Sequence, residues 1–365
     1  MNLLVVNPIL YTPENNIIPE VQTIKDTMIY GMCKGFTVLG HRVTLVASEE
    51  YKPVSDSKYD FEIRFFKSNI KKIFPPTLLP FSFELYKYLK NNRRAYDLVI
   101  CSETFQISTL MAATVFPHKT VIWQEMTTHQ KKYCKIPSKI WHNIILPLFI
   151  KKVKVVIPRS IKAKEFISRY APVVSAEIVD HGIDLDKFRY SATKQRQIIT
   201  SSQLVQRKNI DSIIKIFSKF VRMEGYGDIK LIVAGRGEKR KELELLADEL
   251  GIRQKVRFVG FLPQKELNGF IRESYLFMIN TRQDLNMVSI PESIVSGTPV
   301  LTNLKPASSQ YVASKMLGIA KDDWDENDIK EIVDNNSKYV NNCIHYRESL
   351  SNTYAAGEII KISGL

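Results

Sequence analysis

The sequence predicts an α/β protein of two domains, each a parallel β-sheet covered by helices. The chain has 365 residues, which is more than one core of ordinary size requires and suits two domains. Short apolar runs alternate with amphipathic helical patterns, as expected for parallel sheets. The alternation stops at a polar connection near residue 180 and then begins again. We therefore expect Rossmann-like domains over residues 1–179 and 180–340 that face each other across a cleft, a preferred place for ligands in such folds.

The first domain is expected to begin with a strand at Leu3–Asn7, followed by a loop rich in Pro and Asn. A helix from about Val21 to Leu39 comes next, and Gly40 ends it, because glycine commonly follows the last helical turn. The other apolar runs predict buried strands of the same sheet at Arg42–Ala47, Asp97–Cys101, Thr120–Trp123, Val153–Ile157 and Ala176–Val179.

The second domain repeats this pattern after the connection at Asp180–Tyr190. Strands are expected at Gln197–Ser201, Ile229–Ala234, Val256–Val259, Leu276–Ile279 and Pro299–Thr302. The helices between them are expected at Ile210–Met223, Lys239–Leu250, Gln264–Glu273 and Pro291–Ser296. A strand followed by a helix, repeated in this way, predicts a second parallel sheet.

The lack of a recognisable targeting signal and the pattern of cysteines lead us to expect a cytoplasmic protein. No stretch reaches the ~18 apolar residues that span a bilayer. The N-terminus has no basic region or cleavage site, so it is interpreted as a strand and not as a signal peptide. The four cysteines show no metal-ligand or redox spacing. Cys33 and Cys101 lie in apolar runs and are expected to be buried free thiols in a reducing compartment.

Positive charge is concentrated in the first half of the chain. The net charge is +14, and residues 1–180 carry 25 Lys and Arg against 15 Asp and Glu. The segment Lys131–Lys164 has ten basic residues and no acidic one. Charge of one sign in one domain indicates an anionic partner surface, although a solvated basic face explains it equally simply.

The most informative motif lies between Asp284 and Gly297. A predicted strand leads into a polar loop and a short helix, with Ser289 placed as N-cap and Pro291 in the first turn. The helix N-terminus offers free N–H groups to phosphate oxygens. Carboxylates at Asp284 and Glu292 suit sugar hydroxyls better than a diphosphate, whose charge they repel. The alternative is that Glu292 only favours the helix dipole and Asp284 is a turn residue.

This motif resembles the donor-binding signature of retaining GT-B glycosyltransferases of group 1, the family 4-like transferases. The family has an acid, seven residues and a Glu, followed by Gly-x-Pro-Val; here the first acid is Asp284 where Glu is usual, and Leu285-Asn286-Met287 replaces Gly-Phe-Gly. The resemblance implies a GT-B fold, in which Asp284 contacts the transferred sugar and Glu292 the nucleotide ribose. It also places the backbone amides of Met287, Val288 and Ser289 at the diphosphate.

Further segments resemble the family in order and spacing. They are the hinge entry His181–Phe188, the segment Ser202–Asn209, the Gly-x-Gly at Ala234–Gly237, the turn Val259–Leu262 that cradles the base, and Leu39–Val43. The resemblance implies donor contacts from Gln203, Gly235 and Leu262. It also implies a C-terminal helix from about Asn341 that crosses back to the first domain.

Lys208 and Arg207 are the expected cations of the donor site. Cleavage of a sugar–diphosphate bond builds negative charge on the leaving group, which fixed cations stabilise. The resemblance places Lys208 at the diphosphate, and Gln203 stands where the family has Arg, so Arg207 is a candidate to compensate. The alternative is that both are solvated charges that open a helix. The resemblance implies no metal and no cofactor beyond the nucleotide-sugar co-substrate.

Two other motifs are rejected. Asp184-Leu-Asp186 has the form of a metal-binding Asp-x-Asp, but its neighbours fit the hinge segment. Gly235-x-Gly237 has the form of a dinucleotide fingerprint, but Arg240 stands where the third glycine belongs. In the first domain, relatives often carry a His where this chain has Gln124 and Glu125. Glu125 is interpreted either as the group that accepts a proton or holds an acceptor hydroxyl, or as an ordinary loop acid.

The resemblance implies a retaining glycosyltransferase that moves a sugar, expected from a UDP-sugar, to a glycan or lipid-linked acceptor in polysaccharide or glycolipid synthesis. The alternatives are an epimerase of the same fold and a non-catalytic sugar-nucleotide-binding partner. Trp141, Ile144 and Phe149 lie among the charges of Lys131–Lys164, which favours docking on an anionic membrane over binding of nucleic acid. The alternative is that these apolar residues belong to a buried helix.

Overall fold

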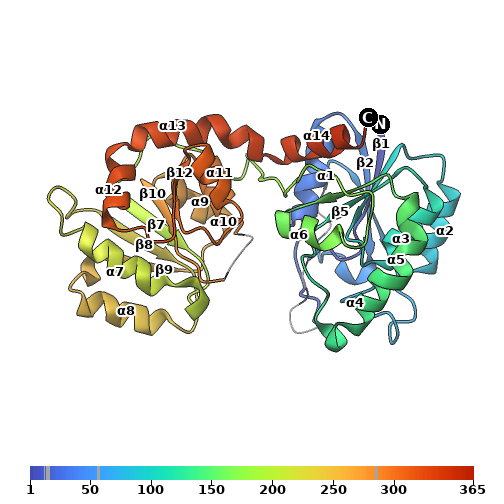
Figure 1. Cartoon of the computed structure of the whole chain (residues 1–365), viewed down its shortest axis with the longest axis horizontal. Coiled ribbons are helices and arrows are strands. Elements are labelled where there is room, and N and C mark those ends of the chain that lie inside the picture. Colours follow the sequence, from blue (N-terminus) through green and yellow to red (C-terminus); the bar gives the residue numbers. More distant parts are fainter. Residues whose placement is uncertain (12, 14–16, 56–57, 284–286) are drawn as a thin grey trace. The chain divides into compact units, whose positions relative to one another are not determined.

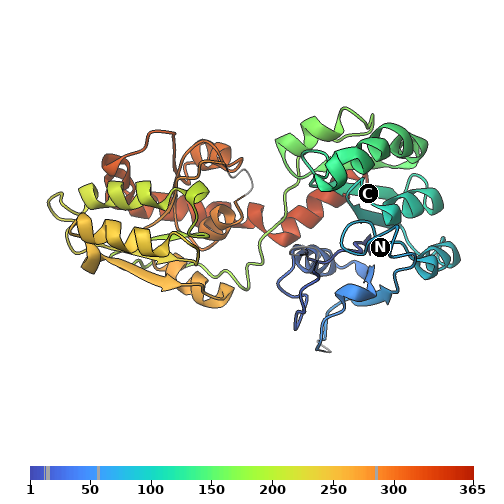
Figure 2. The same cartoon turned by 90° about the horizontal axis from the view of Figure 1, so that it is seen from below.

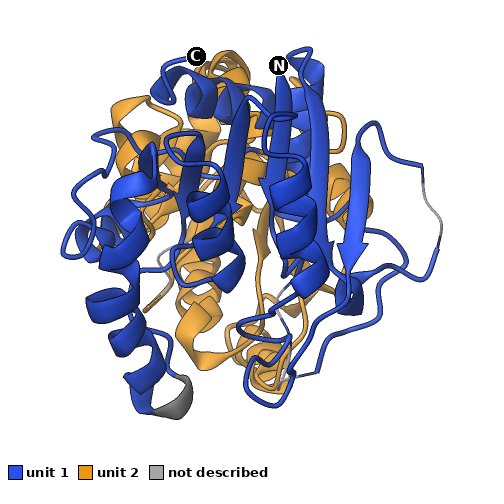
Figure 3. Ribbon diagram, turned by 90° about the vertical axis from the view of Figure 1, so that its right-hand side faces the viewer, with its two compact units in different colours: residues 1–182, 352–365 blue, residues 183–351 orange. Residues whose placement is uncertain are grey.

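The computed structural model describes residues 1–11, 13, 17–55, 58–283 and 287–365. The chain forms two compact units, which Figures 1 and 3 show by sequence and by colour. Unit 1 comprises Met1–Gly182 and Asn352–Leu365, and unit 2 comprises Ile183–Ser351. The segment that returns to unit 1 therefore begins at Asn352, later than the expected Asn341.

Unit 1 is built on a six-stranded parallel sheet with the strand order β3-β2-β1-β4-β5-β6. Its central strand β1 (Asn2–Val6) pairs with β2 on one side and β4 on the other. The remaining strands are β2 (Arg42–Ser48), β3 (Glu62–Phe66), β4 (Leu98–Ser102), β5 (Thr120–Gln124) and β6 (Val155–Pro158).

Alternate residues of β1 face two different cores, because side chains of a strand point to opposite faces. Leu3 and Val5 pack against α1 (Met28–Val38) and α14 (Asn352–Ile362). Leu4 and Val6 pack on the other face, where the cover consists of α2 (Phe83–Asn91), α3 (Ile107–Val115) and a longer helix that starts at Ile136. Helix α6 (Ile161–Ile167) follows β6.

The longer helix is continuous, but its winding changes from α-helical to π-helical, back to α-helical and then to 3₁₀. It consists of α4 (Ile136–Ile140), a π-helical turn η3 (Trp141–Ile145), α5 (Leu146–Phe149) and the 3₁₀ turn η4 (Ile150–Lys152). We call it the flank helix, residues 136–152. Trp141, Leu146 and Phe149 are buried in the core beneath it. Trp141 and Phe149, expected from the sequence at a membrane surface, are therefore core residues, as the alternative interpretation held, whereas Ile144 of the same expectation is 61% exposed.

Two glycines explain why the C-terminal helix packs on unit 1. A Cβ atom on Gly35 would lie 2.4 Å from the Asn352 backbone oxygen, and one on Gly31 would lie 2.6 Å from the Asn352 side chain. Because neither glycine has a side chain, α14 lies directly against α1 (Figure 1). The two chain crossings between the units are also adjacent, because the Ile183 N–H donates to the Leu350 carbonyl at 2.8 Å.

Unit 2 repeats the architecture with a parallel sheet of order β12-β11-β10-β7-β8-β9. Its strands are β7 (Gln197–Ser201), β8 (Lys230–Ala234), β9 (Val256–Gly260), β10 (Leu276–Ile279), β11 (Val300–Thr302) and β12 (Gly318–Ala320). The fold class predicted from the sequence, two parallel α/β sheets, is confirmed.

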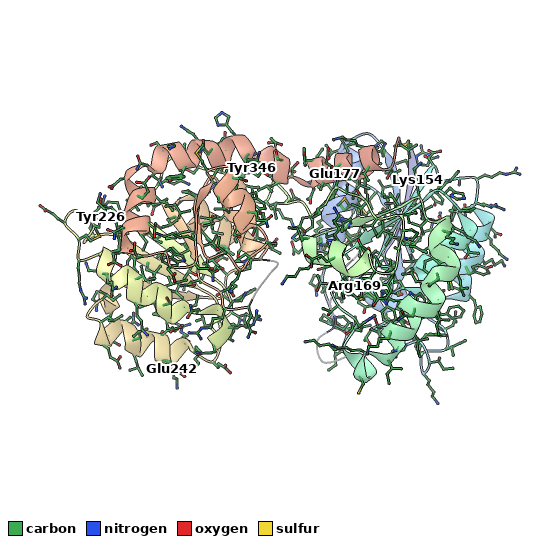
Figure 4. All side chains as sticks on the ribbon, viewed as in Figure 1. Lys154, Arg169, Glu177, Tyr226, Glu242 and Tyr346 are labelled. Atoms are coloured by element: carbon green, nitrogen blue, oxygen red, sulfur yellow. The ribbon has the colours of Figure 1, made fainter. Side chains whose placement is uncertain are left out.

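Helices cover both faces of this second sheet, and α7 and α8 lie side by side in Figures 1 and 2. One core joins the sheet to α7 (Ile210–Phe220), α8 (Arg240–Glu249) and α12 (Glu326–Asp334). The other joins it to α9 (Gln264–Arg272), α10 (Ser289–Val295), α11 (Ser309–Ser314) and α13 (Asn336–Tyr346). The side chains of both units are drawn in Figure 4.

Three local predictions were wrong. Helix α1 begins at Met28, where Thr27 caps it, and not at Val21. Ala176–Val179 is not a strand, although nearby Val174 forms an isolated bridge to β6. The C-terminal helix expected from about Asn341 in the first domain is α14, which begins only at Asn352, whereas α13 belongs to unit 2. Cys33 and Cys101 are buried free thiols, as predicted.

Candidate functional site

The carboxyl edge of the second sheet gathers most of the residues expected to bind the donor. The loop after β7 contains the 3₁₀ turn η5 (Gln206–Lys208). The Arg282 N–H, after β10, donates to the Arg207 carbonyl at 2.9 Å, and the Arg282 guanidinium donates to the Gln206 carbonyl at 2.9 Å. These bonds hold the two loops together, so the segment that carries Lys208 is fixed to the loop that leads to Glu292.

The glycines of Gly235-x-Gly237 allow close packing between loops. A Cβ atom on Gly235 would lie 1.8 Å from the Ser202 carbonyl oxygen, and one on Gly237 would lie 2.3 Å from the Leu204 oxygen. Gly235 also has φ +136, a conformation that side chains disfavour. The loops after β7 and β8 therefore need glycine for their mutual packing, whatever else Gly235 contacts.

The Arg207 side chain contacts another residue of its own loop. Its guanidinium donates to the Gln203 side-chain oxygen at 2.9 Å, so the Arg207 charge lies beside the position where the family has Arg. Lys208 is half-buried at the end of the same turn. The arrangement brings Gln203, Arg207 and Lys208 together on one loop, and the role of each toward a diphosphate stays a prediction.

Glu292 is a buried carboxylate near the start of α10. It is 8% exposed, and burial raises its pKa to about 7. Among the described residues, no side chain or backbone group donates a hydrogen bond to its carboxylate. An unpartnered buried carboxylate is costly, and a ligand with hydroxyl groups, such as a ribose, would supply the missing donors.

The start of α10 differs in detail from the prediction. The helix begins at Ser289 with Val288 at the N-cap, and no side chain caps it, so Ser289 is not the N-cap. Met287 is buried in the core, whereas Val288 is 39% exposed. Asp284, the expected sugar contact, lies outside the described residues together with Leu285 and Asn286.

The turn after β9 offers an exposed aromatic side chain that the sequence analysis did not single out. The Arg236 guanidinium lies 4.5 Å from the centre of the Phe261 ring. Leu262, expected to lie near the base, follows Phe261 and is half-buried. A flat guanidinium–ring pair at the carboxyl edge of the sheet is a surface on which a planar base can stack.

Unit 1 has its own cavity of about 220 Å³ at the carboxyl ends of its strands. Tyr11 and Trp123 give it aromatic walls, and Glu103, Glu125 and Arg159 give it charged groups. Open α/β sheets bind their ligands just outside the carboxyl ends of the parallel strands. The cavity therefore combines the surface types that hold a sugar: aromatic faces and carboxylates.

Glu103 lines this cavity and holds the segment that follows β5 by hydrogen bonds. Its φ is +69, a left-handed conformation uncommon for Glu. Its carboxylate accepts hydrogen bonds from the N–H groups of Glu125 and Met126, at 2.7 and 3.0 Å, and from the Gln124 side chain at 2.7 Å. Burial and the nearby Glu125 charge raise the Glu103 pKa to about 7, against the effect of these hydrogen bonds.

Arg159 connects Glu125 to the hinge segment. Its guanidinium lies 2.7 Å from the Glu125 carboxylate and 3.1 Å from Nδ1 of His181, and it stacks 4.3 Å from the centre of the Trp123 ring. His181 in turn lies 2.8 Å from the Asp180 carboxylate. His181, which the sequence left without a role, is thus part of a charged network at the end of unit 1.

Gln124 is not exposed to the cavity. It is fully buried and accepts a hydrogen bond from the Thr104 N–H at 3.0 Å. His129 contacts Ser138 and Tyr170 under the flank helix. Glu103 and Arg159 were not predicted from the sequence. The signal that would have found both is their position two residues after the predicted strands that end at Cys101 and Ile157.

Two properties of the described chain bear on cofactors and membranes. No three of its His, Cys, Asp or Glu side chains are grouped so as to hold a metal ion. Across the described ranges, no helix combines the length and apolar character that crossing a membrane requires.

Two family models match this chain in sequence. The model for glycosyl transferases group 1 matches residues 183–349, and the model for glycosyltransferase family 4 matches residues 26–187. The boundary between the matches lies where the structure passes from unit 1 to unit 2.

Curated relatives are similar over parts of their length. An alpha-monoglucosyldiacylglycerol synthase from Streptococcus pneumoniae is 25% identical over 186 residues, 47% of this chain and 42% of that protein. A GDP-mannose-dependent alpha-(1-6)-phosphatidylinositol monomannoside mannosyltransferase from Mycolicibacterium smegmatis is 24% identical over 188 residues, 46% of this chain and 48% of that protein. The matches span less than half the length of these two relatives.

Solved structures are similar over the whole fold. The Anabaena protein HepE in complex with UDP superposes with a TM-score of 0.67 at 13% identity, covering 100% of both chains. The lipopolysaccharide outer core galactosyltransferase WaaB superposes with a TM-score of 0.65 at 14% identity, again over 100% of both chains. At these identities the likeness establishes the GT-B fold.

Proposed function

Because this chain belongs to the group 1 glycosyltransferases, we propose that it transfers a sugar, with retention at the anomeric carbon, from a UDP-sugar to a hydroxyl of a glycan or a lipid-linked acceptor. The observation that carries the proposal is the buried carboxylate of Glu292, which has no hydrogen-bond donor among the described residues. A nucleotide ribose supplies such donors. The UDP in the HepE complex supports the choice of nucleotide.

The carboxyl edge of unit 2 is the proposed donor site. Glu292 holds the ribose, and the base stacks near Phe261 and Arg236, where Gly235 and Leu262 belong to the same edge. Lys208 and Arg207 face the diphosphate, together with the backbone amides of Met287, Val288 and Ser289. Asp284 contacts the transferred sugar. The loop-to-loop hydrogen bonds of Arg282 support the arrangement because they fix the segment that carries Lys208.

The proposed reaction follows from this placement. The bond between the anomeric carbon and the diphosphate oxygen breaks, and the acceptor oxygen forms the new bond on the same face of the sugar. The acceptor proton passes to the leaving diphosphate, so no protein base is required. Lys208 stabilises the charge that develops on the leaving group, an electrostatic effect that is strong at a protected site. No metal and no further cofactor take part in the proposed mechanism.

The cavity of unit 1 is the proposed acceptor site. Tyr11 offers a ring face to a sugar, and the second oxygen of Glu125, which Arg159 does not occupy, is available to hold the acceptor hydroxyl. The glycolipid synthases among the relatives support a lipid-linked acceptor. We propose that the protein works in the cytoplasm at the membrane face, in glycolipid or polysaccharide synthesis.

A donor screen tests the proposal. Purified protein is heated with UDP-, GDP- and ADP-sugars, and the expected result is a concentration-dependent rise in Tm with a UDP-sugar, since a ligand at a hundredfold excess over its Kd adds about 2.7 kcal/mol. Product analysis with the stabilising donor then separates the alternatives. Release or transfer of the sugar indicates a transferase, an isomerised donor indicates an epimerase, and binding without turnover indicates a non-catalytic partner.

A further inference from the structure

We propose that the outer side of the flank helix is a membrane-docking surface that inserts four aliphatic side chains among anionic lipid headgroups. The proposal rests on the proposed function, because it names the surface through which a lipid-linked acceptor is reached. Of the residues expected from the sequence to dock, Trp141 and Phe149 are buried and Ile144 is exposed, so the surface coincides only in part with the expected one. It is an exposed ridge of Ile136, Ile140, Ile144 and Leu148.

The ridge is regular. Its four residues recur at every fourth position and are 56%, 47%, 61% and 72% exposed. The opposite side of the same helix is buried, and the Trp141 indole N–H donates to the Thr104 carbonyl at 2.8 Å. The helix is thus anchored to the sheet on one side and presents large apolar side chains to solvent on the other, over its full length.

The π-helical turn explains why the ridge stays in line. In an α-helix, four residues turn through about 400°, so a row at every fourth position drifts by about 40° per step. A π-helical turn is wider and winds less per residue. The turn at Trp141–Ile145 lies in the middle of the row. It offsets the drift and keeps Ile144 and Leu148 on the outward side where Ile136 and Ile140 lie.

Lysines flank the ridge. Lys135 precedes the first residue of the flank helix, Lys139 lies beside Ile140 in sequence, and Lys151 and Lys152 end the helix. All four are exposed. Beyond them lies Lys154, also exposed and labelled in Figure 4. The sequence from residue 131 to 164 contains no acidic residue, so no carboxylate within it neutralises this surface.

This combination fits a lipid surface. An apolar ridge bordered by cations matches a bilayer interface, where aliphatic chains enter the headgroup boundary and lysines meet anionic lipids. A second copy of the chain would bring its own lysines against these lysines, and like charges across an interface are unfavourable. The charge therefore favours a membrane over self-association as the partner of the ridge.

The test uses the full chain with vesicles of phosphatidylcholine alone or mixed with phosphatidylglycerol, in sedimentation at low and high salt. We expect binding only to the anionic vesicles, and release as salt rises, because screening weakens charge attraction. Ile144→Glu is expected to weaken binding at least about tenfold, since it removes an inserted apolar side chain and adds a repelled charge. Lys139→Glu with Lys151→Glu is expected to do the same.

Leu245→Glu is the matched control, because Leu245 lies on α8 of unit 2 and is also 61% exposed. It is expected to bind vesicles like the wild type. Equal binding by Ile144→Glu and the wild type, or no binding to anionic vesicles at low salt, overturns the proposal. So does a dimer in vesicle-free solution that Ile144→Glu dissociates, which would make the ridge an interface between copies.

The same variants separate this proposal from the proposed function. Ile144→Glu is expected to keep the rise in Tm that a UDP-sugar produces, because the ridge lies in unit 1 and the proposed donor site in unit 2. Vesicle binding without stabilisation by any sugar nucleotide would reject the transferase and leave the docking surface standing. Stabilisation without vesicle binding would do the reverse.

Discussion

The Arg159 guanidinium lies 2.7 Å from the Glu125 carboxylate, so one oxygen of Glu125 is already engaged in an ion pair. Arg159 is buried and Glu125 is half-exposed at the cavity of unit 1. The pair presents the remaining carboxylate oxygen in a fixed direction. This geometry favours the interpretation that Glu125 holds an acceptor hydroxyl over its interpretation as an ordinary loop acid.

Glu125→Gln is expected to raise the acceptor KM by about tenfold, the effect of losing one hydrogen bond to a charged group. The donor Kd should not change. Steady-state kinetics with varied acceptor measure the effect, and Glu177→Gln, an exposed carboxylate of the same unit labelled in Figure 4, is the control. A fall in kcat of a hundredfold or more with unchanged KM would instead mark Glu125 as a proton acceptor.

Glu292→Gln is expected to weaken nucleotide binding by about tenfold or more, because a charged hydrogen bond to ribose is lost. Burial raises the Glu292 pKa to about 7, and hydroxyl donors prefer the ionised carboxylate. Nucleotide affinity of the wild type should therefore rise as pH increases through 7, and the variant should show no such rise from this group. Titration calorimetry on both sides of pH 7 measures this, and unchanged affinity in the variant would reject the ribose contact.

Asp284→Asn is expected to act differently, on turnover. A contact to the sugar whose bond breaks contributes in the transition state, so its loss lowers kcat more than it changes nucleotide affinity. Donor Kd by calorimetry and kcat by product formation separate the two effects. A weaker donor affinity with unchanged kcat would instead show that Asp284 contributes equally to the ground state and the transition state.

Lys208→Ala is expected to lower the transfer rate by two to three orders of magnitude, as for loss of one group that stabilises developing charge, about 3 kcal/mol of barrier. Arg207→Ala is the comparison. Its guanidinium is bonded to Gln203, and it should cost less if Lys208 carries the larger share. Activity should survive a chelator, because the proposed mechanism uses no metal. A near-normal rate in Lys208→Ala would contradict this mechanism.

The regular elements followed from the sequence because they depend on local patterns. Leu276–Ile279 was predicted with its observed bounds, since four apolar residues in a row form a buried strand in a parallel sheet. Ala176–Val179, three apolar residues interrupted by Glu177, was also predicted as a strand but is not one. Strand formation requires a neighbour with free backbone groups, which a local pattern does not specify.

The candidate site was predictable only where it follows a motif. Glu292 and Lys208 were found through the spacing of their neighbours. Glu103 was missed because its function depends on contacts with Glu125 and Met126, twenty or more positions along the chain. Such contacts form through strand pairing between β4 and β5. Phe261 was overlooked for a related reason, because its partner Arg236 belongs to another loop.

Gly31 and Gly35 let α14 pack closely on α1. Gly35→Ala is expected to destabilise the protein by about 1–3 kcal/mol, because the new Cβ would meet the Asn352 backbone oxygen at 2.4 Å and forced overpacking costs this much. Gly31→Ala should cost less, because its Cβ would meet the Asn352 side chain, whose end can move. Gly269→Ala in α9 is the control, since no atom lies within 4 Å of its Cβ position and alanine favours a helix by roughly 0.5–1 kcal/mol. Urea unfolding measures the free energy of unfolding of each variant. The expected order, from most to least stable, is Gly269→Ala, wild type, Gly31→Ala and Gly35→Ala. If Gly35→Ala is as stable as the wild type, the Asn352 backbone of α14 does not lie as close to Gly35 as the 2.4 Å distance requires.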